Sequence, residues 1–458
     1  MRAWRRGWAF VLAGAIAPVS TARAEGVDVS AYREVADKLI AAARTQGRAW
    51  ERLTDLTDLF GHRLSGSPQL EAALRWAADE MKKDGLEDVR LEPVMVPRWV
   101  RGRENLDLVE PDGGSLVLLG LGGSVGTPPE GVTAELMVVK SFEDLDARAA
   151  EARGRIVLYN VPFTKYGETV RYRGAGASRA AKHGAVATLL RSVGLPGLRT
   201  PHTGALRYEE GTPRIPAAAI PFEDADRLQR LADRKLKVVL KLRMEAQTLP
   251  DVPSANLVAE WKGREKPDEI VLIGGHIDSW DVGTGAMDDG GGSVVMWEAV
   301  RLMKSLGLRP RRTVRVVLFT NEENGLRGGT AYRDAHQSET HVAAIESDSG
   351  VFKPRGFGFT GTDAARAIVK TVASLLDPID TANVASDGGG ADIGPLVRAK
   401  KVPSFSLDVD GSRYFLLHHT PADTLDKLDP DDVGRCVATV AVMAYVLADL
   451  PERLPLAP

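Results

Sequence analysis

Acidic residues and histidines occur in this sequence in separate groups, each just past an apolar run. The groups are His276-Ile277-Asp278, Asp288-Asp289, Glu322-Glu323, Asp348 and a late His419. Imidazole nitrogens and carboxylate oxygens both bind zinc in proteins. If the groups converge, two histidines and several carboxylates meet at one place. The sequence therefore offers enough donor atoms for a site that binds two zinc-like ions.

Each group also has an ordinary explanation when it is taken alone. An acid pair such as Glu322-Glu323 is usually a solvated start of a helix, and Asp288-Asp289 is a suitable helix cap. His419, next to His418, is compatible with a surface loop. Only the shared position of the groups after apolar runs favours a metal site over these explanations.

Alternating strands and helices are expected to position these groups. From residue 254 onward the sequence predicts strands at 269–274, 313–320 and 341–347, with helices at 293–306, 326–336, 364–376 and 430–447. Val-, Ile- and Leu-rich strands between amphipathic helices indicate a mainly parallel sheet that is covered on both faces. Ligands of such sheets bind beyond the carboxyl ends of the strands, where the acidic groups lie.

A bridging carboxylate is needed because two close dications repel each other, and such ions lie roughly 3.5 to 4 Å apart. Asp288 is the best candidate, because its segment 283–292 is rich in glycine and can fold tightly around a site. Asp278, two residues beyond His276, is expected to accept the free imidazole N–H of that histidine. Asp423 is expected to do the same for His419.

The 458 residues exceed one ordinary core and predict two to three domains. Three arginines, the apolar stretch 8–17 and a small-residue cleavage site at 22–24 predict a signal peptide over residues 1–24. The mature protein is therefore expected to be periplasmic or secreted. Within residues 25–104 we expect two or three helices, one of them capped by Ser67 with Pro68 in its first position.

Residues 105–247 differ in sequence pattern from the segments on either side. Short β-type runs at 133–139, 155–160 and 235–242 alternate with Gly and Pro clusters, and one helix is predicted at about 170–183. None of the acidic groups lies there. We therefore predict an inserted β-rich domain at 105–247, between a first part (25–104) and a second part (248–458) of the domain that carries the metal site.

The composition excludes several classes of partner. The formal net charge is −3 and no long block carries one sign, so nothing indicates a nucleic-acid partner. Cys436 is the only cysteine, which excludes an internal disulfide. Beyond the leader, no segment is long and apolar enough to predict a membrane span in the mature chain.

The motifs, in order, resemble those of the co-catalytic di-zinc exopeptidases of the bacterial leucyl aminopeptidase and carboxypeptidase Q type. The matching stretches are His276-Ile277-Asp278-Ser279, Ala286-Met287-Asp288-Asp289-Gly290, Asn321-Glu322-Glu323-Asn324-Gly325-Leu326, Glu346-Ser347-Asp348 and His419-Thr420-Pro421-Ala422-Asp423-Thr424. The middle block also resembles the protease-associated domain of carboxypeptidase Q-like members. The resemblance implies an α/β fold, with a mainly parallel mixed sheet flanked by helices and an inserted β-rich protease-associated domain.

The resemblance also implies a role for each group. Two Zn²⁺ would bind per chain with Asp288 as the bridge, and Glu322 would be the catalytic acid and base. The remaining ligands implied are His276 and Asp348 for one ion, and Glu323 and His419 for the other. The family often has a cis peptide after the bridging aspartate, which here joins Asp288 to Asp289.

One departure from the family pattern concerns the substrate pocket. Some aminopeptidases of this group have a tyrosine directly before the last histidine ligand, whereas here His418 stands there and the nearest tyrosine is Tyr414. The group that stabilises the oxyanion therefore stays open. Segment 386–392 lies where family members shape the pocket, so Asp387 or Asp392 is a candidate anchor for a substrate amine. An ordinary acidic turn explains that segment equally well.

The function expected from these observations is an exported zinc-dependent exopeptidase that hydrolyses dipeptides or short peptides. The metal ligands do not decide between an aminopeptidase and a carboxypeptidase Q-like dipeptidase, because both share them. Two other classes remain as alternatives: a single-zinc glutaminyl cyclase-like acyltransferase and a non-catalytic, receptor-like scaffold. The oligomeric state is not readable from the sequence, and a homodimer stays open.

Overall fold

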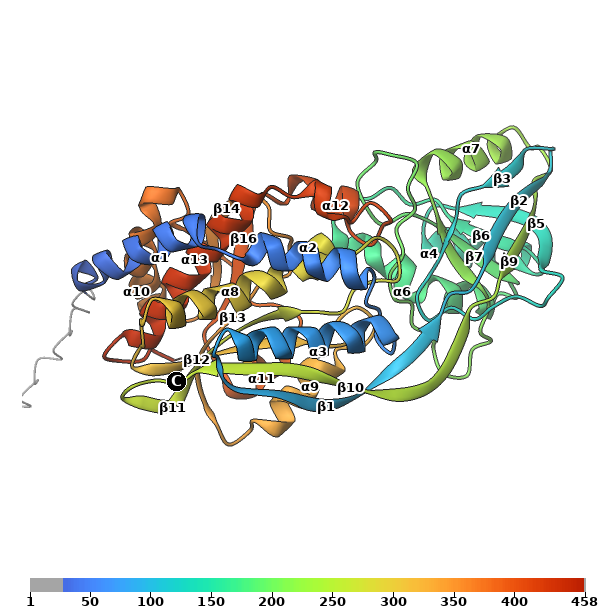
Figure 1. Cartoon of the computed structure of the whole chain (residues 1–458). Helices are drawn as coiled ribbons and strands as arrows, with labels where there is room; N and C mark the ends of the chain where they lie inside the picture. Colours follow the sequence, from blue (N-terminus) through green and yellow to red (C-terminus); the bar gives the residue numbers. More distant parts are fainter. Residues whose placement is uncertain (1–27, 457–458) are drawn as a thin grey trace, which may run out of the picture.

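The computed structural model describes residues 28–456, which form two sheets with helices around them (Figure 1). The main sheet has eight strands in the order β1-β10-β12-β11-β13-β16-β14-β15, and the second sheet has eight in the order β3-β2-β9-β5-β6-β7-β8-β4. In Figure 1 the second sheet, with α4, α6 and α7, forms the right-hand end of the molecule. The signal peptide predicted for residues 1–24 lies outside the described residues.

The main sheet is mixed and is parallel at its centre. Its strands are β1 (Glu87–Val100), β10 (Gln247–Trp261), β11 (Lys266–His276), β12 (Arg312–Phe319), β13 (Thr340–Glu346), β14 (Pro354–Thr360), β15 (Asn383–Ser386) and β16 (Ser404–Val409). β11 pairs in parallel with both β12 and β13, and β13 pairs in parallel with β16. β10 and β14 run antiparallel to their neighbours β12 and β16. The predicted α/β fold class is confirmed.

Helices cover both faces of this sheet. They are α1 (Arg33–Thr45), α2 (Ala49–Phe60), α3 (Pro68–Lys83), α8 (Gly291–Ser305), α9 (Arg327–Ala335), α10 (Asp363–Ala373), α11 (Gly394–Lys400), α12 (Tyr414–Leu417) and α13 (Pro430–Asp449). Short helical turns lie at Ser30–Tyr32, Ala286–Gly290, Ser374–Ile379, Gly411–Arg413 and Leu425–Lys427. Ser67 caps α3 as predicted, because its side chain accepts the N–H of Leu70 at 3.2 Å and Pro68 follows at the first helical position.

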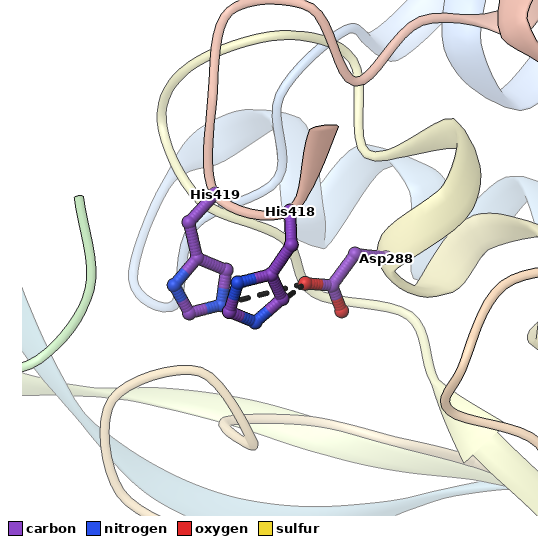
Figure 2. A group of neighbouring side chains, drawn as sticks. All are labelled: Asp288, His418 and His419. Carbon is purple, nitrogen blue, oxygen red and sulfur yellow. Dashed lines mark ion pairs between the residues drawn. The ribbon is translucent and has the colours of Figure 1, made fainter. Parts of the chain in front are cut away.

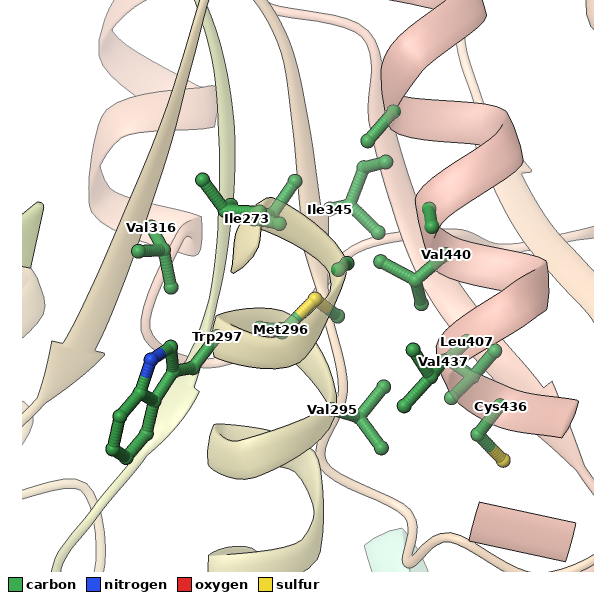
Figure 3. Close-up of a cluster of buried hydrophobic side chains, with 14 of the residues drawn as sticks. Ile273, Val295, Met296, Trp297, Val316, Ile345, Leu407, Cys436, Val437 and Val440 are labelled. Atoms are coloured by element: carbon green, nitrogen blue, oxygen red, sulfur yellow. The ribbon is translucent and has the colours of Figure 1, made fainter. Parts of the chain in front are cut away.

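The core follows from the alternation of side chains along the strands. One face packs against α8 and α13, as Figure 3 shows for the strand residues Ile273, Val316 and Ile345. The other face packs against α9 and α11 through Leu272, Val317 and Ala344. Strands that are buried on both faces must be apolar throughout, which is the run of Val, Ile and Leu seen in the sequence.

The second sheet holds the chain from residue 104 to 244. Its strands are β2 (Glu104–Glu110), β3 (Gly114–Leu116), β4 (Leu119–Gly120), β5 (Val132–Val139), β6 (Ile156–Tyr159), β7 (Ala187–Arg191), β8 (Ala217–Ile220) and β9 (Val239–Met244). β5 to β8 pair in parallel, and β2, β3, β4 and β9 pair antiparallel. Four helices pack on it: α4 (Phe142–Ala147), α5 (Ala149–Ala152), α6 (Tyr166–Lys182) and α7 (Phe222–Asp233).

Only one of these four helices was expected from the sequence. The helix predicted at 170–183 is α6, whereas α4, α5 and α7 were not predicted. The strand predicted at 235–242 begins only at Val239, because the residues before it close α7. Lys235 has a φ of 58° and its N–H donates to Ala232 O at 2.8 Å, which is a helix end in the left-handed conformation.

The paired strands β1 and β10 connect the two sheets. Their antiparallel register runs from Glu87 opposite Glu260 to Val100 opposite Gln247, so the chain enters and leaves the second sheet at one place (Figure 1). The second-sheet region also contacts α12, one of the helices that accompany the main sheet. There the N–H of Leu195 donates to Phe415 O at 2.9 Å. No helix among the described residues is long and apolar enough to cross a membrane.

Candidate metal centre

Three neighbouring parallel strands deliver the acidic groups to one edge of the main sheet. His276 is the last residue of β11, Glu322 and Glu323 follow β12, and Asp348 follows β13. Asp288 lies in the turn Ala286–Gly290 before α8, and His419 follows α12. The carboxyl ends of adjacent parallel strands share one sheet edge, which is why residues from distant parts of the sequence converge.

The Asp288 carboxylate lies between two histidines. Its Oδ1 is 3.3 Å from His276 Nε2, and its Oδ2 is 3.4 Å from His419 Nε2. Oδ2 is buried without a hydrogen-bond partner among the described residues. One oxygen thus faces each imidazole, which is the arrangement of a carboxylate that bridges two ions. The peptide between Asp288 and Asp289 is cis, as expected.

Each histidine also faces a second carboxylate. Asp348 Oδ1 is 3.3 Å from His276 Nε2, and Glu323 Oε2 is 3.0 Å from His419 Nε2. Glu323 Oε1 is buried and has no partner among the described residues. The donor atoms of His276, Asp288 and Glu323 lie within 4.8 Å of one another, and so do those of Asp288, His418 and His419. Two sets of donors therefore share Asp288.

Burial and the neighbouring charges shift the pKa values of the acids and histidines in this site. Burial raises the pKa of Glu323 well above its usual range, and the neighbouring Asp288 adds to the shift. Burial would lower the pKa of His276, but its contacts with Asp288 and Asp348 raise it well above the usual value. Ionising three acids in a buried site costs free energy unless cations lie beside them. This excess of buried acid, with unpartnered carboxylate oxygens, fits a site for cations.

The outward nitrogen of His276 is held by a carbonyl. Nδ1 lies 3.0 Å from the carbonyl oxygen of Asp278, whereas the Asp278 carboxylate is 3.8 Å away. That carboxylate accepts the N–H of Glu322 at 3.2 Å and of Glu323 at 3.4 Å. We expected the carboxylate of Asp278 to accept the N–H of His276, but the backbone carbonyl of Asp278 does so. The side chain of Asp278 instead fixes the turn that carries the acid pair.

Asp423 does not hold His419, contrary to expectation. Its carboxylate accepts the N–H of Met287 at 2.7 Å and of Asp288 at 3.2 Å, so it supports the turn of the central aspartate. His419 Nδ1 lies instead 3.2 Å from the carbonyl oxygen of Thr203, in the second-sheet region. The hydrogen bond from Asp423 N–H to Thr420 O closes a turn that directs Asp423 away from the imidazole.

Arg63 and Asp289 also support the site. Arg63 is fully buried, and its guanidinium donates to the carbonyl oxygens of Ile277 at 2.7 Å and Gly285 at 2.9 Å. Burial lowers the pKa of Arg63 to about 10. Asp289 accepts the N–H of His276 at 3.1 Å. The sequence marked the pair Asp288-Asp289, but it predicted neither this contact of Asp289 nor a role for Arg63.

A cavity of about 570 Å³ opens onto the centre and contains most of the predicted pocket residues. Glu322, Asp387, Tyr414 and His418 line it, together with Tyr166 and Arg173 of the second-sheet region. Asp392 does not line it, because its carboxylate is buried, and neither of its oxygens has a partner among the described residues. Of the two alternative anchors for a substrate amine, only Asp387 lines the cavity.

Glu322 and His418 border the acids at the floor of the cavity. Burial raises the pKa of Glu322 to about 8, with His276 opposing the shift and Asp348 adding to it. Figure 2 shows the rings of His418 and His419 side by side next to Asp288, with centroids 3.5 Å apart. His418 Nε2 lies 3.7 Å from Asp288 Oδ2, and burial lowers the pKa of His418 well below its usual value. The imidazole of His418 thus faces the cavity.

A second cavity of about 780 Å³ reaches the same acids from the other side. It lies between α6 with the segment 205–210 and the turn 322–326, and it also includes Glu322 and Glu323. The centre therefore lies between the main sheet and the second-sheet region. Atoms of both regions border the space in which a substrate would react.

Several known proteins are similar in sequence to this chain. A model described as peptidase family M28 matches residues 256–444. Mouse carboxypeptidase Q is 47% identical over 433 residues, which are 93% of this chain and 92% of that protein. The rat protein of the same name is 49% identical over the same shares of each chain. An aminopeptidase of Bacillus subtilis is 24% identical and covers 87% of this chain and 84% of its own.

Solved structures agree with these relatives. The crystal structure of a peptidase M28 precursor from Shewanella amazonensis is 38% identical, with a TM-score of 0.89, and the match covers 93% of this chain and 99% of that chain. A zinc aminopeptidase from Bacillus subtilis is 22% identical, with a TM-score of 0.66, and the match covers 89% of this chain and 98% of its own. At that identity the second structure shows a shared fold.

Proposed function

The chain belongs to peptidase family M28 and is a zinc-dependent exopeptidase, and from that premise we propose that it is exported and uses two Zn²⁺ to hydrolyse dipeptides or short peptides. One observation carries the proposal. Asp288 has one carboxylate oxygen towards each of two histidines, at 3.3 and 3.4 Å. A single-ion site has no need for a carboxylate that is shared in this way.

The proposed ligands divide into two sets around Asp288. His276 and Asp348 would hold one ion, and Glu323 and His419 would hold the other. When bound, zinc supplies Lewis-acid chemistry, because it acidifies water and polarises a carbonyl group. The oxygen and nitrogen donors fit zinc, and the unpartnered oxygens of Asp288 and Glu323 are consistent with ligand positions.

Glu322 is proposed as the general base and acid. Its carboxylate lines the cavity and makes no hydrogen bond within the described residues. It would take a proton from water as the oxygen bonds to the scissile carbonyl carbon. It would then pass that proton to the nitrogen as the carbon–nitrogen bond breaks, which releases a neutral amine.

The pocket supports a substrate with free ends. Asp387 is exposed in the cavity and would bind a substrate amine, and the guanidinium of Arg173 offers a cation for a free carboxylate. We propose His418 as the donor to the oxyanion, with Tyr414 beside it as the second candidate. The greater identity to carboxypeptidase Q than to the aminopeptidase supports carboxypeptidase or dipeptidase activity.

A panel of peptides tests the proposal. The purified mature protein is assayed with zinc on free dipeptides, on N-blocked peptides and on C-amidated peptides. We expect hydrolysis of free dipeptides and none of C-amidated ones. Cleavage of amidated but not of N-blocked peptides would instead identify an aminopeptidase. If the zinc-loaded protein cleaves none of them, the proposed activity is wrong.

Metal stoichiometry separates the other two classes. Elemental analysis of the purified protein should find about two zinc per chain. One zinc per chain would favour the cyclase-like acyltransferase, and none would favour the receptor-like scaffold.

The proposed export has its own test. N-terminal sequencing of the mature protein from a secreting host should find residue 25 as its first residue. We also propose that residues 105–247 form a protease-associated-like domain between the two parts, 25–104 and 248–458, of the peptidase domain.

A further inference from the structure

The second-sheet region contacts His419 through both the backbone and the ring of that histidine. Thr203 lies between β7 and β8, yet its N–H donates to the carbonyl oxygen of His419 at 2.9 Å. In return, His419 Nδ1 lies 3.2 Å from the carbonyl oxygen of Thr203. Two atoms of one residue thus fix the main chain and the imidazole of the histidine. Both residues are buried.

The direction of the second contact follows from the ring. His419 Nε2 faces the carboxylates of Asp288 and Glu323, at 3.4 and 3.0 Å. A nitrogen that binds a cation carries no proton, so the proton of the neutral ring belongs on Nδ1. Nδ1–H then donates to the Thr203 carbonyl. A carbonyl in this position fixes the tautomer and the orientation of a metal-binding imidazole.

Arg173 holds the same carbonyl from α6. Its Nη1 is 3.3 Å from Thr203 O and also 3.3 Å from His419 Nδ1. A guanidinium only donates, so it donates to the carbonyl and not to a protonated nitrogen. Its Nη2 donates to the hydroxyl of Tyr166 at 2.7 Å. Thr203 O therefore has two donors, and its position is fixed.

Gly204 makes this close packing possible. A Cβ at residue 204 would lie 2.3 Å from Cζ of Arg173, and the φ of Gly204 is 137°, which side-chain-bearing residues rarely adopt. The Thr203 hydroxyl donates to Gly120 O at 2.7 Å. Arg101, next to that hydroxyl, pairs with Asp281 of the main domain, with Nε 2.9 Å from Oδ2. The segment around Thr203 is thus attached to both regions.

We infer that Thr203 is a positioning residue that orients the imidazole of His419 for zinc, so that the second-sheet region is a working part of the metal centre. The inference rests on the proposed function, in which His419 binds zinc. It predicts that moving the carbonyl of Thr203 weakens zinc binding on the His419 side and leaves the other ion in place.

The test measures zinc affinity in Gly204→Ala, whose added methyl group displaces Arg173 and the adjoining carbonyl. Competition with a chromophoric chelator should show that the variant binds the zinc on the His419 side about tenfold less tightly than wild-type does. Loss of a residue that supports a metal ligand typically has an effect of this size. The visible spectrum of the Co²⁺-substituted protein should change as well. Gly211→Ala is the matched control, because Gly211 also has a positive φ, of 75°, but a Cβ there meets nothing within 4 Å.

A second variant tests the inference if Gly204→Ala is less stable than its control. If metal-free Gly204→Ala unfolds at a lower temperature than Gly211→Ala, the same measurements are made on Arg173→Met, which removes one donor to Thr203 O and leaves the glycine in place. We expect a weaker second zinc and an altered Co²⁺ spectrum there also. Wild-type zinc affinity and spectrum in the folded variant would overturn the inference.

The outcomes separate this inference from the proposed function. Wild-type protein should bind two zinc and His419→Ala one. If wild-type binds fewer than two, or if His419→Ala keeps both, the proposed ligand set fails. If those two results hold while the variants at 204 and 173 bind zinc as wild-type does, only the role of Thr203 fails.

Discussion

At the scale of single residues, the decisive features are unpartnered carboxylates in a buried site. Asp288 and Glu323 each keep one buried oxygen without a donor, and the carboxylate of Glu322 is free within the described residues. An unmade contact of a buried polar group is costly, so it persists where a ligand completes it. Two of the proposed ligands, Asp288 and Glu323, thus lie where protein contacts are missing.

The proposed base gives a prediction about turnover. Glu322→Gln keeps the shape of the side chain and removes its proton acceptor. We expect kcat to fall by about 10²- to 10⁴-fold, because general acid and base catalysis contributes that much. Zinc content, measured by elemental analysis, should stay at the wild-type level, since Glu322 is not among the proposed ligands. A variant with near-normal kcat would remove Glu322 from the mechanism.

The site could be predicted from residue types only in part. His276, Asp288 and Glu323 stand at strand ends or in a glycine-rich turn, so chemistry and placement marked them, and the structure brings them together. Thr203 was not predictable. It acts through a backbone carbonyl, which every residue possesses, and it lies 216 positions from His419 in the sequence. Roles carried by main-chain atoms leave no signal in residue identity.

At the scale of elements, the three central strands of the main sheet were predicted from the sequence, whereas β1, β10, β14, β15 and β16 were not. Strands buried on both faces show continuous apolar runs, and β11, β12 and β13 were each predicted to within a few residues. The second-sheet region was less predictable. Its helix α7 follows a strand directly and ends in a left-handed turn at Lys235, so the predicted strand began too early.

The link between β1 and α9 predicts a dependence of stability on pH. His336, after α9, has Nε2 2.9 Å from Glu92 of β1 and Nδ1 2.9 Å from Glu339, with Arg315 nearby. Burial lowers the pKa of His336, but the contacts with Glu339 and Glu92 outweigh it and raise the pKa above 6.5. This contribution is full below the unfolded pKa and is lost as pH rises through the folded value.

Urea unfolding at two pH values measures this contribution. The free energy of unfolding of wild-type should exceed that of His336→Gln by more at pH 6 than at pH 9. Adding Glu92→Gln to the histidine variant should cost less than Glu92→Gln alone, because the partner charge is already absent. An equal difference between wild-type and His336→Gln at both pH values would mean that His336 is neutral in the folded protein.

At the scale of the whole molecule, the metal centre joins two regions that each have their own core. The main sheet supplies the proposed ligands, and the second-sheet region supplies Thr203, Arg173 and one wall of each cavity. Proposed zinc binding therefore draws on both regions at once. Loss of the ions should therefore lower the stability of both regions and not only of the ligand segments.

Removal of zinc should lower the thermal stability of the whole protein. Without cations, the buried carboxylates repel one another, and each lost ion removes its binding energy from the folded state. At a free zinc concentration of 100 times Kd, one site contributes about 2.7 kcal/mol. Calorimetry should show a lower Tm after chelation and recovery when zinc is restored. Recovery with Zn²⁺ but not with Mg²⁺ is the control, and an unchanged Tm would contradict the proposed site.

The paired strands β1 and β10 also constrain the order in which the protein folds. Val100 lies opposite Gln247, although 146 residues separate them in the sequence. An unfolded loop of that length makes the closure slow, because entropy opposes bringing its ends together. Once the second sheet has formed, its antiparallel strands β2 and β9 hold the two ends side by side. We therefore expect the second sheet to form first and to bring β1 and β10 together at the edge of the main sheet.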